Sequence, residues 1–165
     1  MQGDSIASGR VVGTTGLGCP PMPKHDPDCR FCQIVAGDEA AHVVLEDDTS
    51  IGFLDNRPLF HGHTLLLPRD HHETLADLPA KLFGPLFANA QRLSVAVPSA
   101  MQKPGSFIAL NNVVSQSVPH LHVHVVPRVP KDGLRGFFWP RTKYESEDQM
   151  REVAELVRKA LERAT

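Results

Sequence analysis

The sequence is poor in cysteine, tyrosine and tryptophan and has no large excess of charge of one sign. Of its 165 residues, three are cysteine, one is tyrosine and one is tryptophan, and the formal net charge at pH 7 is −2. Three cysteines do not build the disulfide framework of a small secreted protein, so a reducing, cytoplasmic location is expected. The near-neutral charge gives no reason to expect nucleic acid or an anionic membrane surface as a partner.

The sequence also lacks long apolar runs, and its first residues lack the basic and apolar regions typical of a secretory leader, so none is expected. A membrane-spanning helix needs about 20 consecutive apolar residues, and no stretch approaches that length, so no membrane association is expected. With 41% apolar residues, a chain of 165 residues suits one compact domain. Residues 1–28 are rich in Gly, Ser, Thr and Pro, and we predict a flexible N-terminal tail there.

Short strand patterns and helical patterns fill the rest of the chain. Hydrophobic periodicity and turn residues predict strands near 42–46, 50–54, 63–68, 106–110 and 120–126. Helices are predicted over 31–36, over 78–97, where Pro85 should kink or delay the helix, and from Ser146 onward. Short strands joined by tight turns, with a central helix and a C-terminal helix, predict an α+β fold on a mainly antiparallel sheet of about five strands.

Three histidines alternate with apolar residues in the segment 118–126, which reads Val-Pro-His-Leu-His-Val-His-Val-Val. The alternation has the period of a β-strand, so His120, His122 and His124 are expected on one face of it. At about 3.3 Å of rise per residue the outer two histidines lie about 13 Å apart, too far to share one metal ion. The three rings should therefore have separate roles, and a neutral imidazole is a capable nucleophile near pH 7.

A Cys-x-x-Cys pair, Cys29 and Cys32, precedes the first predicted strand. The spacing is compatible with half of a zinc site, with a redox pair, or with two ordinary thiols. Because the sequence has no second cysteine pair, a tetrahedral metal site would have to be completed by histidines. The available ones are His42, His61, His63, His71, His72 and the histidines of segment 118–126.

Asp55 and Asn56 follow the second predicted strand, just before Pro58. An Asp-Asn-x-Pro sequence is well suited to a turn, which is one interpretation of these residues. The other is a binding role, since a carboxylate at a strand end can accept hydrogen bonds from a diol such as a ribose. The sequence pattern alone favours the turn.

Together these segments resemble the histidine triad (HIT) superfamily of nucleotide hydrolases and transferases. The superfamily signature, Gln-[Ser/Thr]-Val-x-His-φ-His-φ-His-φ-φ with φ apolar, is matched by residues 116–126. The segments 29–37, 53–58 and 62–71 are similar to the family's opening segment, its nucleoside-contacting turn and its Gly-His-x-φ-φ-φ-Pro-[Lys/Arg]-x-His stretch. The resemblance implies a HIT-like fold, with a core at 29–130 and a branch-specific loop and helix at 131–165 packed on the same domain.

The resemblance also implies a covalent mechanism. The middle histidine, His122, would attack the α-phosphate of a nucleotide and carry a nucleotidyl group, with a backbone carbonyl orienting its other nitrogen. His124 and Ser117 would contact phosphate oxygens or assist the leaving group. The implied nucleotide-binding residues are Phe31, Ile34, Leu54, Asp55, Asn56, Asn111, Asn112, Gln116, Ser117 and His124. The apolar members Phe31, Ile34 and Leu54 also fit an alternative interpretation as core residues.

Branches of the superfamily that retain Cys-x-x-Cys bind a structural zinc ion. The ligands in those branches are the two cysteines, the histidine of Pro-x-x-His and the first triad histidine. In this sequence they correspond to Cys29, Cys32, His71 and His120, with His72 as the alternative to His71. Four protein ligands leave no open position for a catalytic water, so this zinc would be structural. No organic cofactor is expected.

The substrate implied by the resemblance is a nucleoside phosphoramidate or a dinucleoside polyphosphate, with adenosine favoured, hydrolysed by a homodimer. Phosphorolysis and nucleotidyl transfer are alternatives within the same chemistry. A non-catalytic nucleotide-binding adaptor and a metal-dependent hydrolase are alternatives from other classes. For the aromatic segment 131–141, packing against the last helix or a dimer contact is favoured over a lid.

Overall fold

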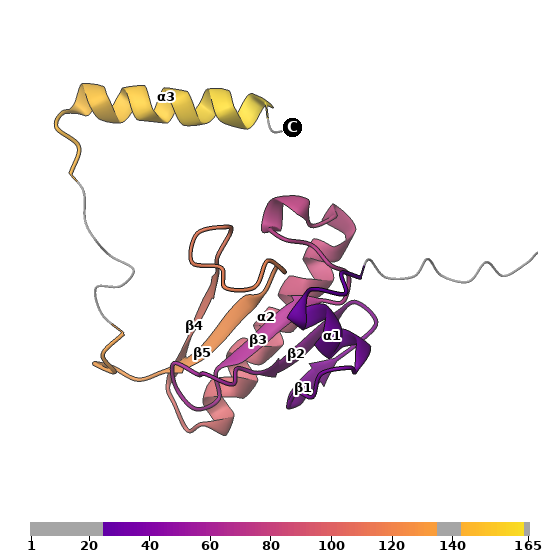
Figure 1. Cartoon of the computed structure of the whole chain (residues 1–165). Helices are drawn as coiled ribbons and strands as arrows, with labels where there is room; N and C mark the ends of the chain where they lie inside the picture. Colours follow the sequence, from indigo (N-terminus) through magenta and orange to yellow (C-terminus); the bar gives the residue numbers. More distant parts are fainter. Residues whose placement is uncertain (1–24, 135–142, 164–165) are drawn as a thin grey trace, which may run out of the picture. The chain divides into compact units, whose positions relative to one another are not determined.

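The computed structural model describes residues 25–134 and 143–163 of the chain. The chain divides into two compact units, Met1–Arg128 and Val129–Thr165. The first contains the sheet and two α-helices, and the described residues of the second contain one helix (Figure 1). Most of the predicted N-terminal tail and of the aromatic segment lies outside the described residues.

The first unit is a five-stranded sheet in which all neighbouring strands run antiparallel. The strand order is β1-β2-β3-β5-β4, so only β5 is inserted out of sequence order. The strands are β1 Val43–Glu46, β2 Ser50–Leu54, β3 Thr64–Pro68, β4 Gly105–Leu110 and β5 Val123–Arg128. The helices are α1 Arg30–Ala36, a 3₁₀ turn at Leu75–Asp77, α2 Ala80–Ala100 and, in the second unit, α3 Glu147–Arg163. The predicted α+β fold is confirmed.

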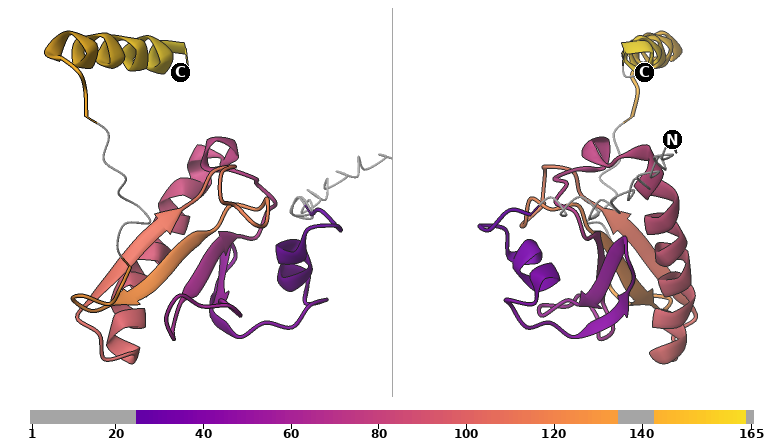
Figure 2. Two further views of the ribbon diagram at one scale, coloured as in Figure 1. Left: turned by 60° about the vertical axis from the view of Figure 1, so that its left-hand side comes forward. Right: turned by 90° about the vertical axis from the view of Figure 1, so that its right-hand side faces the viewer.

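Helices cover both faces of the sheet, with α2 on one face and α1 on the other (Figure 2). Because both faces are covered, the central strand β3 is buried along its whole length, as its apolar sequence Thr-Leu-Leu-Leu-Pro indicates. Leu66 packs into the cluster under α2, whereas Leu65 and Leu67 pack on the other side with Phe31 and Cys32 of α1. Opposite faces of one strand thus tie the α2 core to the segment that carries the cysteines.

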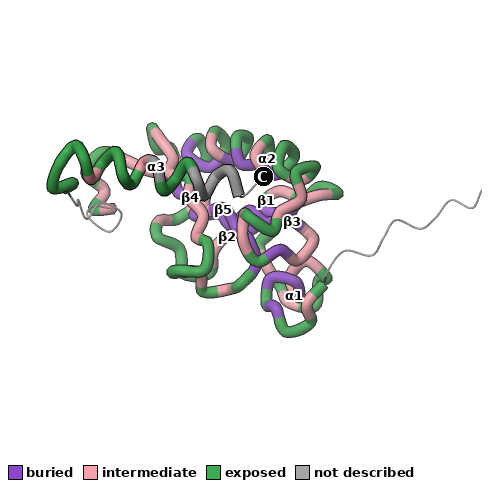
Figure 3. The backbone as a smooth tube through the Cα atoms, turned by 90° about the horizontal axis from the view of Figure 1, so that it is seen from above, coloured by how far each residue is buried: buried purple, intermediate pink, exposed green. Residues whose placement is uncertain are grey.

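The long helix α2 runs through both of its prolines, Pro85 and Pro98. The expected delay at Pro85 is therefore wrong, since the helix already begins at Ala80. Burial of one stripe supplies the stabilisation, because Leu86, Ala90 and other apolar residues on that stripe pack against the sheet (Figure 3). In the described part of the chain, no helix is both long enough and apolar enough to span a bilayer.

The histidine segment is only partly a strand, which corrects the prediction of a strand through all three triad residues. Strand β5 begins at Val123, so His120 and His122 precede it and only His124 lies within it. The backbone before β5 is engaged elsewhere. The His120 N–H donates to the Val118 carbonyl (2.8 Å) and the Leu121 N–H to the His72 carbonyl (2.5 Å). The apolar residues Leu121, Val123 and Val125 are fully buried, but His120 and His122 are buried as well, so burial does not alternate along the segment.

Gly62 occupies a position that only glycine suits, directly before the buried His63. Its φ is +92°, and an added Cβ would lie 2.6 Å from Cγ of Met101. We expect Gly62→Ala to lower the free energy of unfolding by about 2 kcal/mol, through left-handed backbone strain and this clash. Urea unfolding measures the change.

Gly84→Ala in α2 is the matched control for this substitution. Nothing lies within 4 Å of the Cβ position at Gly84, and its backbone is helical. Alanine is the better helix former there, so Gly84→Ala should stabilise the protein by about 0.5–1 kcal/mol. Equal effects of the two substitutions would contradict this account of Gly62.

Candidate active site and metal centre

His122 is a buried histidine with one nitrogen fixed by the backbone. Its Nδ1 lies 2.6 Å from the carbonyl oxygen of His120. A carbonyl only accepts, so Nδ1 carries the hydrogen and, in the neutral ring, Nε2 keeps its lone pair. Burial lowers the pKa of His122, which favours the neutral form at pH 7. The Phe31 ring meets the imidazole edge to face, with 5.2 Å between ring centroids, and limits its rotation.

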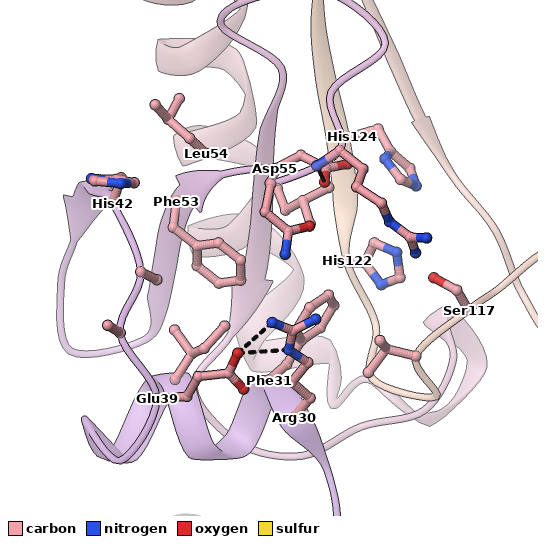
Figure 4. A pocket seen from close by; sticks show the side chains of 17 residues that line it. Arg30, Phe31, Glu39, His42, Phe53, Leu54, Asp55, Ser117, His122 and His124 are labelled. Atoms are coloured by element: carbon pink, nitrogen blue, oxygen red, sulfur yellow. Dashed lines mark hydrogen bonds and ion pairs between the residues drawn. The ribbon is translucent and has the colours of Figure 1, made fainter.

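A cavity of about 700 Å³ opens beside His122. That volume lies in the range of small-molecule and nucleotide sites. The sequence-predicted residues that line it are Phe31, Ile34, Leu54, Asp55, Asn56, Ser117, His122 and His124. Figure 4 shows Asp55 between the apolar side chain of Phe53 and the two histidines. Along the cavity wall, an apolar part at Phe53 is therefore followed by the carboxylate of Asp55 and then by the two imidazoles.

Three predicted nucleotide-binding residues do not line this cavity and instead brace the loop before the triad. Gln116 donates from Nε2 to the Glu73 carbonyl (2.6 Å), and the Asn112 side-chain oxygen accepts the Leu75 N–H (2.9 Å). Asn111 donates to a carbonyl of its own loop (3.4 Å). These hydrogen bonds hold the loop that carries Ser117. A direct contact with nucleotide stays a prediction for all three residues.

Cys29, Cys32, His71 and His120 converge on one point behind the histidine segment. One ligand atom from each lies within 4.8 Å of all the others. Both sulfurs lie 3.6 Å from Nδ1 of His120, and Sγ of Cys32 lies 3.3 Å from Nδ1 of His71. Tetrahedral zinc with bonds of about 2.0–2.3 Å separates its ligands by about 3.3–3.8 Å, so the donor types and spacings fit.

The neighbouring histidines make this ligand set specific. Nε2 of His120 donates to the Pro68 carbonyl (3.0 Å), which leaves Nδ1 as the nitrogen available to a metal. His71 belongs to the cluster and His72 does not, although the sequence left that choice open. Cys32 and His120 are fully buried, so a metal here would have no face open to substrate.

Burial also lowers the pKa of His124, to about 4, with further lowering by His122 and His63. Its ordinary value is 6.5, so on acidification the unfolded chain takes up the proton first. The stability that neutral His124 contributes is complete above pH 6.5 and is lost as the pH falls toward 4. We therefore expect the melting temperature to fall between pH 7 and pH 5.

The variant His124→Asn isolates this contribution. It retains the four residues of the metal cluster, so any acid sensitivity of a bound metal is common to both proteins. The fall in melting temperature between pH 7 and pH 5 should be smaller in His124→Asn than in the wild type. Parallel falls would show that His124 contributes nothing to the pH dependence.

Arg30, Glu39 and Arg57 were not singled out from the sequence, and His63 was named there only as a possible metal ligand. Arg30 donates from Nε to Oε1 of Glu39 (2.7 Å), and the pair lines the cavity together with Arg57. His63 lies behind His124 and is 2% exposed. The sequence signal for His63 was its position in the Gly-His stretch, but nothing in that stretch alone indicates which residue it contacts.

The family assignment follows from a comparison with protein-family models. A model described as the HIT domain matches residues 36–131, more than half of the chain. The chain belongs to the HIT family. The match includes the triad residues, His71 and most of the cavity wall, and the two cysteines lie just before it.

Three similar proteins place the chain within this family. The adenylylsulfatase of Arabidopsis thaliana is 31% identical over 124 residues, which are 74% of this chain but only 63% of that longer protein. The adenosine 5'-monophosphoramidase of Saccharomyces cerevisiae is 30% identical over 135 residues, 79% of this chain and 81% of the relative. A zinc-bound histidine triad protein of Mycobacterium smegmatis has a TM-score of 0.62 and 35% identity, covering 80% of this chain and 97% of that one.

Proposed function

We propose that this HIT protein is a nucleotide hydrolase or transferase that acts at the α-phosphate of an adenosine nucleotide, with His122 as the nucleophile. The orientation of the His122 ring carries the proposal. Its Nδ1–H is held by the His120 carbonyl, and its pKa is lowered by burial. The same ring lines a cavity of nucleotide size that also holds Asp55.

The proposed reaction has two steps. In the first, the Nε2 lone pair of His122 forms a bond to phosphorus, and the bond from phosphorus to the leaving group breaks with its electron pair going to that group, which takes up a solvent proton if it is an amine. In the second, water forms a bond to phosphorus and releases one proton to solvent, the P–N bond breaks, and its electrons return to Nε2. The His120 carbonyl accepts Nδ1–H throughout and stabilises the positive ring of the intermediate.

The proposed substrate is AMP joined to a small leaving group such as an amine or sulfate. The two named relatives support this class, since one is called an adenylylsulfatase and the other an adenosine 5'-monophosphoramidase. Both names imply an adenylyl group attached to a leaving group that is not a nucleoside. Dinucleoside polyphosphates remain the alternative, and phosphorolysis or transfer would use the same nucleotidyl-His122.

The other residues of the cavity have proposed roles that follow from their chemistry. Asp55 would accept hydrogen bonds from the ribose hydroxyls, with Phe31 and Leu54 against the base, and Ser117 and His124 would contact phosphate oxygens or the leaving group.

We expect 2'-deoxyadenosine substrates to lose about tenfold in kcat/KM, since one charge-assisted hydrogen bond is removed. In Asp55→Asn the ribose and deoxyribose substrates should differ much less. An undiminished ratio there would contradict the ribose role.

A structural zinc ion is proposed for the cluster of Cys29, Cys32, His71 and His120. The ligand spacing supports it, as does the zinc-bound relative from M. smegmatis. Bound zinc would supply rigidity rather than reaction chemistry, because all four ligands come from the protein. Homodimerisation and a cytoplasmic location are further proposals that rest on the family resemblance and on composition.

A panel of substrates tests the proposed function. It contains an AMP-lysine amidate, adenylyl sulfate, and diadenosine tri- and tetraphosphate, each with and without added phosphate. We expect release of AMP from the amidate or the sulfate compound. Faster turnover with phosphate would select phosphorolysis, and nucleotide binding without turnover of any compound would favour the adaptor.

A further inference from the structure

His63 is a buried histidine that contacts the site without lining the cavity. Its Nε2 lies 3.0 Å from Nδ1 of His124, with 5.2 Å between the ring centroids. On its other side, Nδ1 of His63 receives the backbone N–H of Leu59 at 3.2 Å. Oδ2 of Asp55 lies 3.3 Å from the same Nδ1. The ring therefore bridges the turn after β2 and the last triad histidine.

The Leu59 contact determines where the hydrogen of His63 lies. A backbone N–H can only donate, so Nδ1 of His63 must accept and carries no hydrogen. Burial lowers the pKa of His63, more than the facing charge of Asp55 raises it, so the ring is neutral at pH 7. A neutral ring without hydrogen on Nδ1 carries it on Nε2. His63 is thus a donor toward His124.

The same reasoning determines which nitrogen of His124 carries the hydrogen. Because His63 donates at Nε2, Nδ1 of His124 accepts and its own hydrogen lies on Nε2. His124 lines the cavity beside His122, with 4.9 Å between the two ring centroids. A donor there can stabilise negative charge that develops on a phosphate oxygen or the leaving atom.

We propose that His63 is a positioning residue that holds His124 as the Nε2–H tautomer and so presents a hydrogen-bond donor to the reacting phosphate. This proposal rests on the proposed function for its catalytic consequence, but not for the tautomer itself. It involves no proton transfer through His63. The residue acts by orienting and tautomer selection alone, as a buried partner does for other catalytic imidazoles.

Asp55 is the group that competes with this arrangement. Its carboxylate would attract a hydrogen on Nδ1 of His63, which would reverse both rings and leave His124 with no hydrogen on Nε2. The Leu59 N–H opposes that state, because a hydrogen on Nδ1 of His63 would face this donor and remove its acceptor. When a ribose diol occupies Asp55, the carboxylate oxygens are engaged by hydroxyls, so the Nε2–H tautomer of His124 should persist in the AMP complex.

Nitrogen NMR of the histidine rings tests the tautomer directly in the full chain. The protein labelled with ¹⁵N is examined alone and with AMP, at pH 7, and His124 is assigned by its absence in His124→Asn. We expect the chemical shift of a protonated nitrogen at Nε2 of His124 and of an unprotonated one at Nδ1. Protonation of Nδ1 in either state would overturn the proposal.

Variants at His63 test the consequence. Gln can donate from a position close to that of His Nε2, whereas Leu fills the space without a donor. We expect His63→Leu to lower kcat by roughly 10- to 100-fold with little change in KM and to mix the His124 tautomers. His63→Gln should restore both. His61→Leu, an exposed histidine two residues earlier outside the cavity wall, is the matched control and should behave as the wild type.

The two proposals fail in different ways. If the wild type turns over no substrate of the panel, the proposed function fails, while the nitrogen shifts still decide the tautomer. If the wild type is active and folded His63→Leu keeps its kcat and its Nε2–H tautomer, the positioning role fails alone. Thermal unfolding of each variant establishes that it is folded before its kcat is compared, and the wild-type nitrogen shifts decide the proposal if His63→Leu does not fold.

Discussion

Replacing His122 with alanine is expected to reduce kcat by at least about 1,000-fold, because the proposed covalent route has no other nucleophile. The side chain is 3% exposed and lines the cavity, so its loss removes the attacking nitrogen without removing a surface contact. Single-turnover kinetics with the best substrate of the panel measures the effect on the chemical step. AMP binding, measured by calorimetry, should survive, since Asp55 and the apolar wall remain.

The exposed His61 supplies the control for this experiment as well. His61→Ala should keep wild-type kcat, which excludes a general effect of removing an imidazole. A His122→Ala protein that is folded and turns over within tenfold of the wild type would end the covalent proposal. A metal-dependent hydrolase would then be the favoured alternative, and its turnover rate should fall when a chelator removes the metal.

Loss of the metal cluster has the second large expected effect. We expect Cys32→Ala to abolish stoichiometric metal binding and to lower the free energy of unfolding by about 4 kcal/mol or more, the range of metal-site losses. Cys32 is fully buried and joins α1 to the segment before β5 through His120. Without a metal those segments keep the apolar packing around Phe31 and Leu65 but lose the link through four shared ligands.

Elemental analysis of the purified chain and urea unfolding, with and without a chelator, make the measurement. One zinc ion per wild-type chain and none per Cys32→Ala chain is the expected result. Cys19→Ala is the control, since that cysteine lies outside the Cys-x-x-Cys pair in the sequence. An unchanged unfolding midpoint in Cys32→Ala would contradict a structural role for the site.

Loss of the metal can affect the active site through His120. Its Nδ1 faces the two cysteines, and its backbone carbonyl holds Nδ1 of His122. A displaced His120 would release the hydrogen bond that orients the nucleophile. In a metal-free protein that is still folded, kcat should therefore fall while KM changes less.

Local patterns were enough to predict most elements of the fold. The strands β1 and β2 and the turn between them follow from two short apolar segments on either side of Asp47, whose carboxylate accepts the N–H groups of Thr49 and Ser50 (2.8 and 2.9 Å). Gly37 ends α1 in the left-handed conformation that favours glycine, as its position after the apolar run indicates. These features depend on neighbours in sequence, so the sequence reveals them.

The start of β5 could not be predicted this way. The alternation of residue types continues through His120 and His122, but the backbone there bonds to Val118 and to His72, which lies 49 positions before Leu121. The segment is buried on both sides, so its alternating sequence does not reveal whether it pairs in the sheet. Tertiary contacts therefore decide where the strand begins.

Long-range contacts also separate the site residues that were foreseen from those that were not. Asp55 and Ser117 could be placed by resemblance to a known pattern, and both line the cavity. The pairing of His63 with His124 joins residues 61 positions apart, one directly before β3 and the other on the neighbouring strand β5, which no local spacing encodes. Bracing by Gln116 depends likewise on a carbonyl at Glu73.

Detection of a nucleotidyl group on His122 is the most direct test of the account. The wild type is mixed with the amidate or adenylyl sulfate, quenched within one turnover at alkaline pH to protect the acid-labile P–N bond, digested and sequenced by mass spectrometry. The account predicts an adenylyl group on the ring of His122 that disappears as AMP is released. Rapid turnover with His122 unmodified throughout, or an adenylyl group on a different residue, would contradict it.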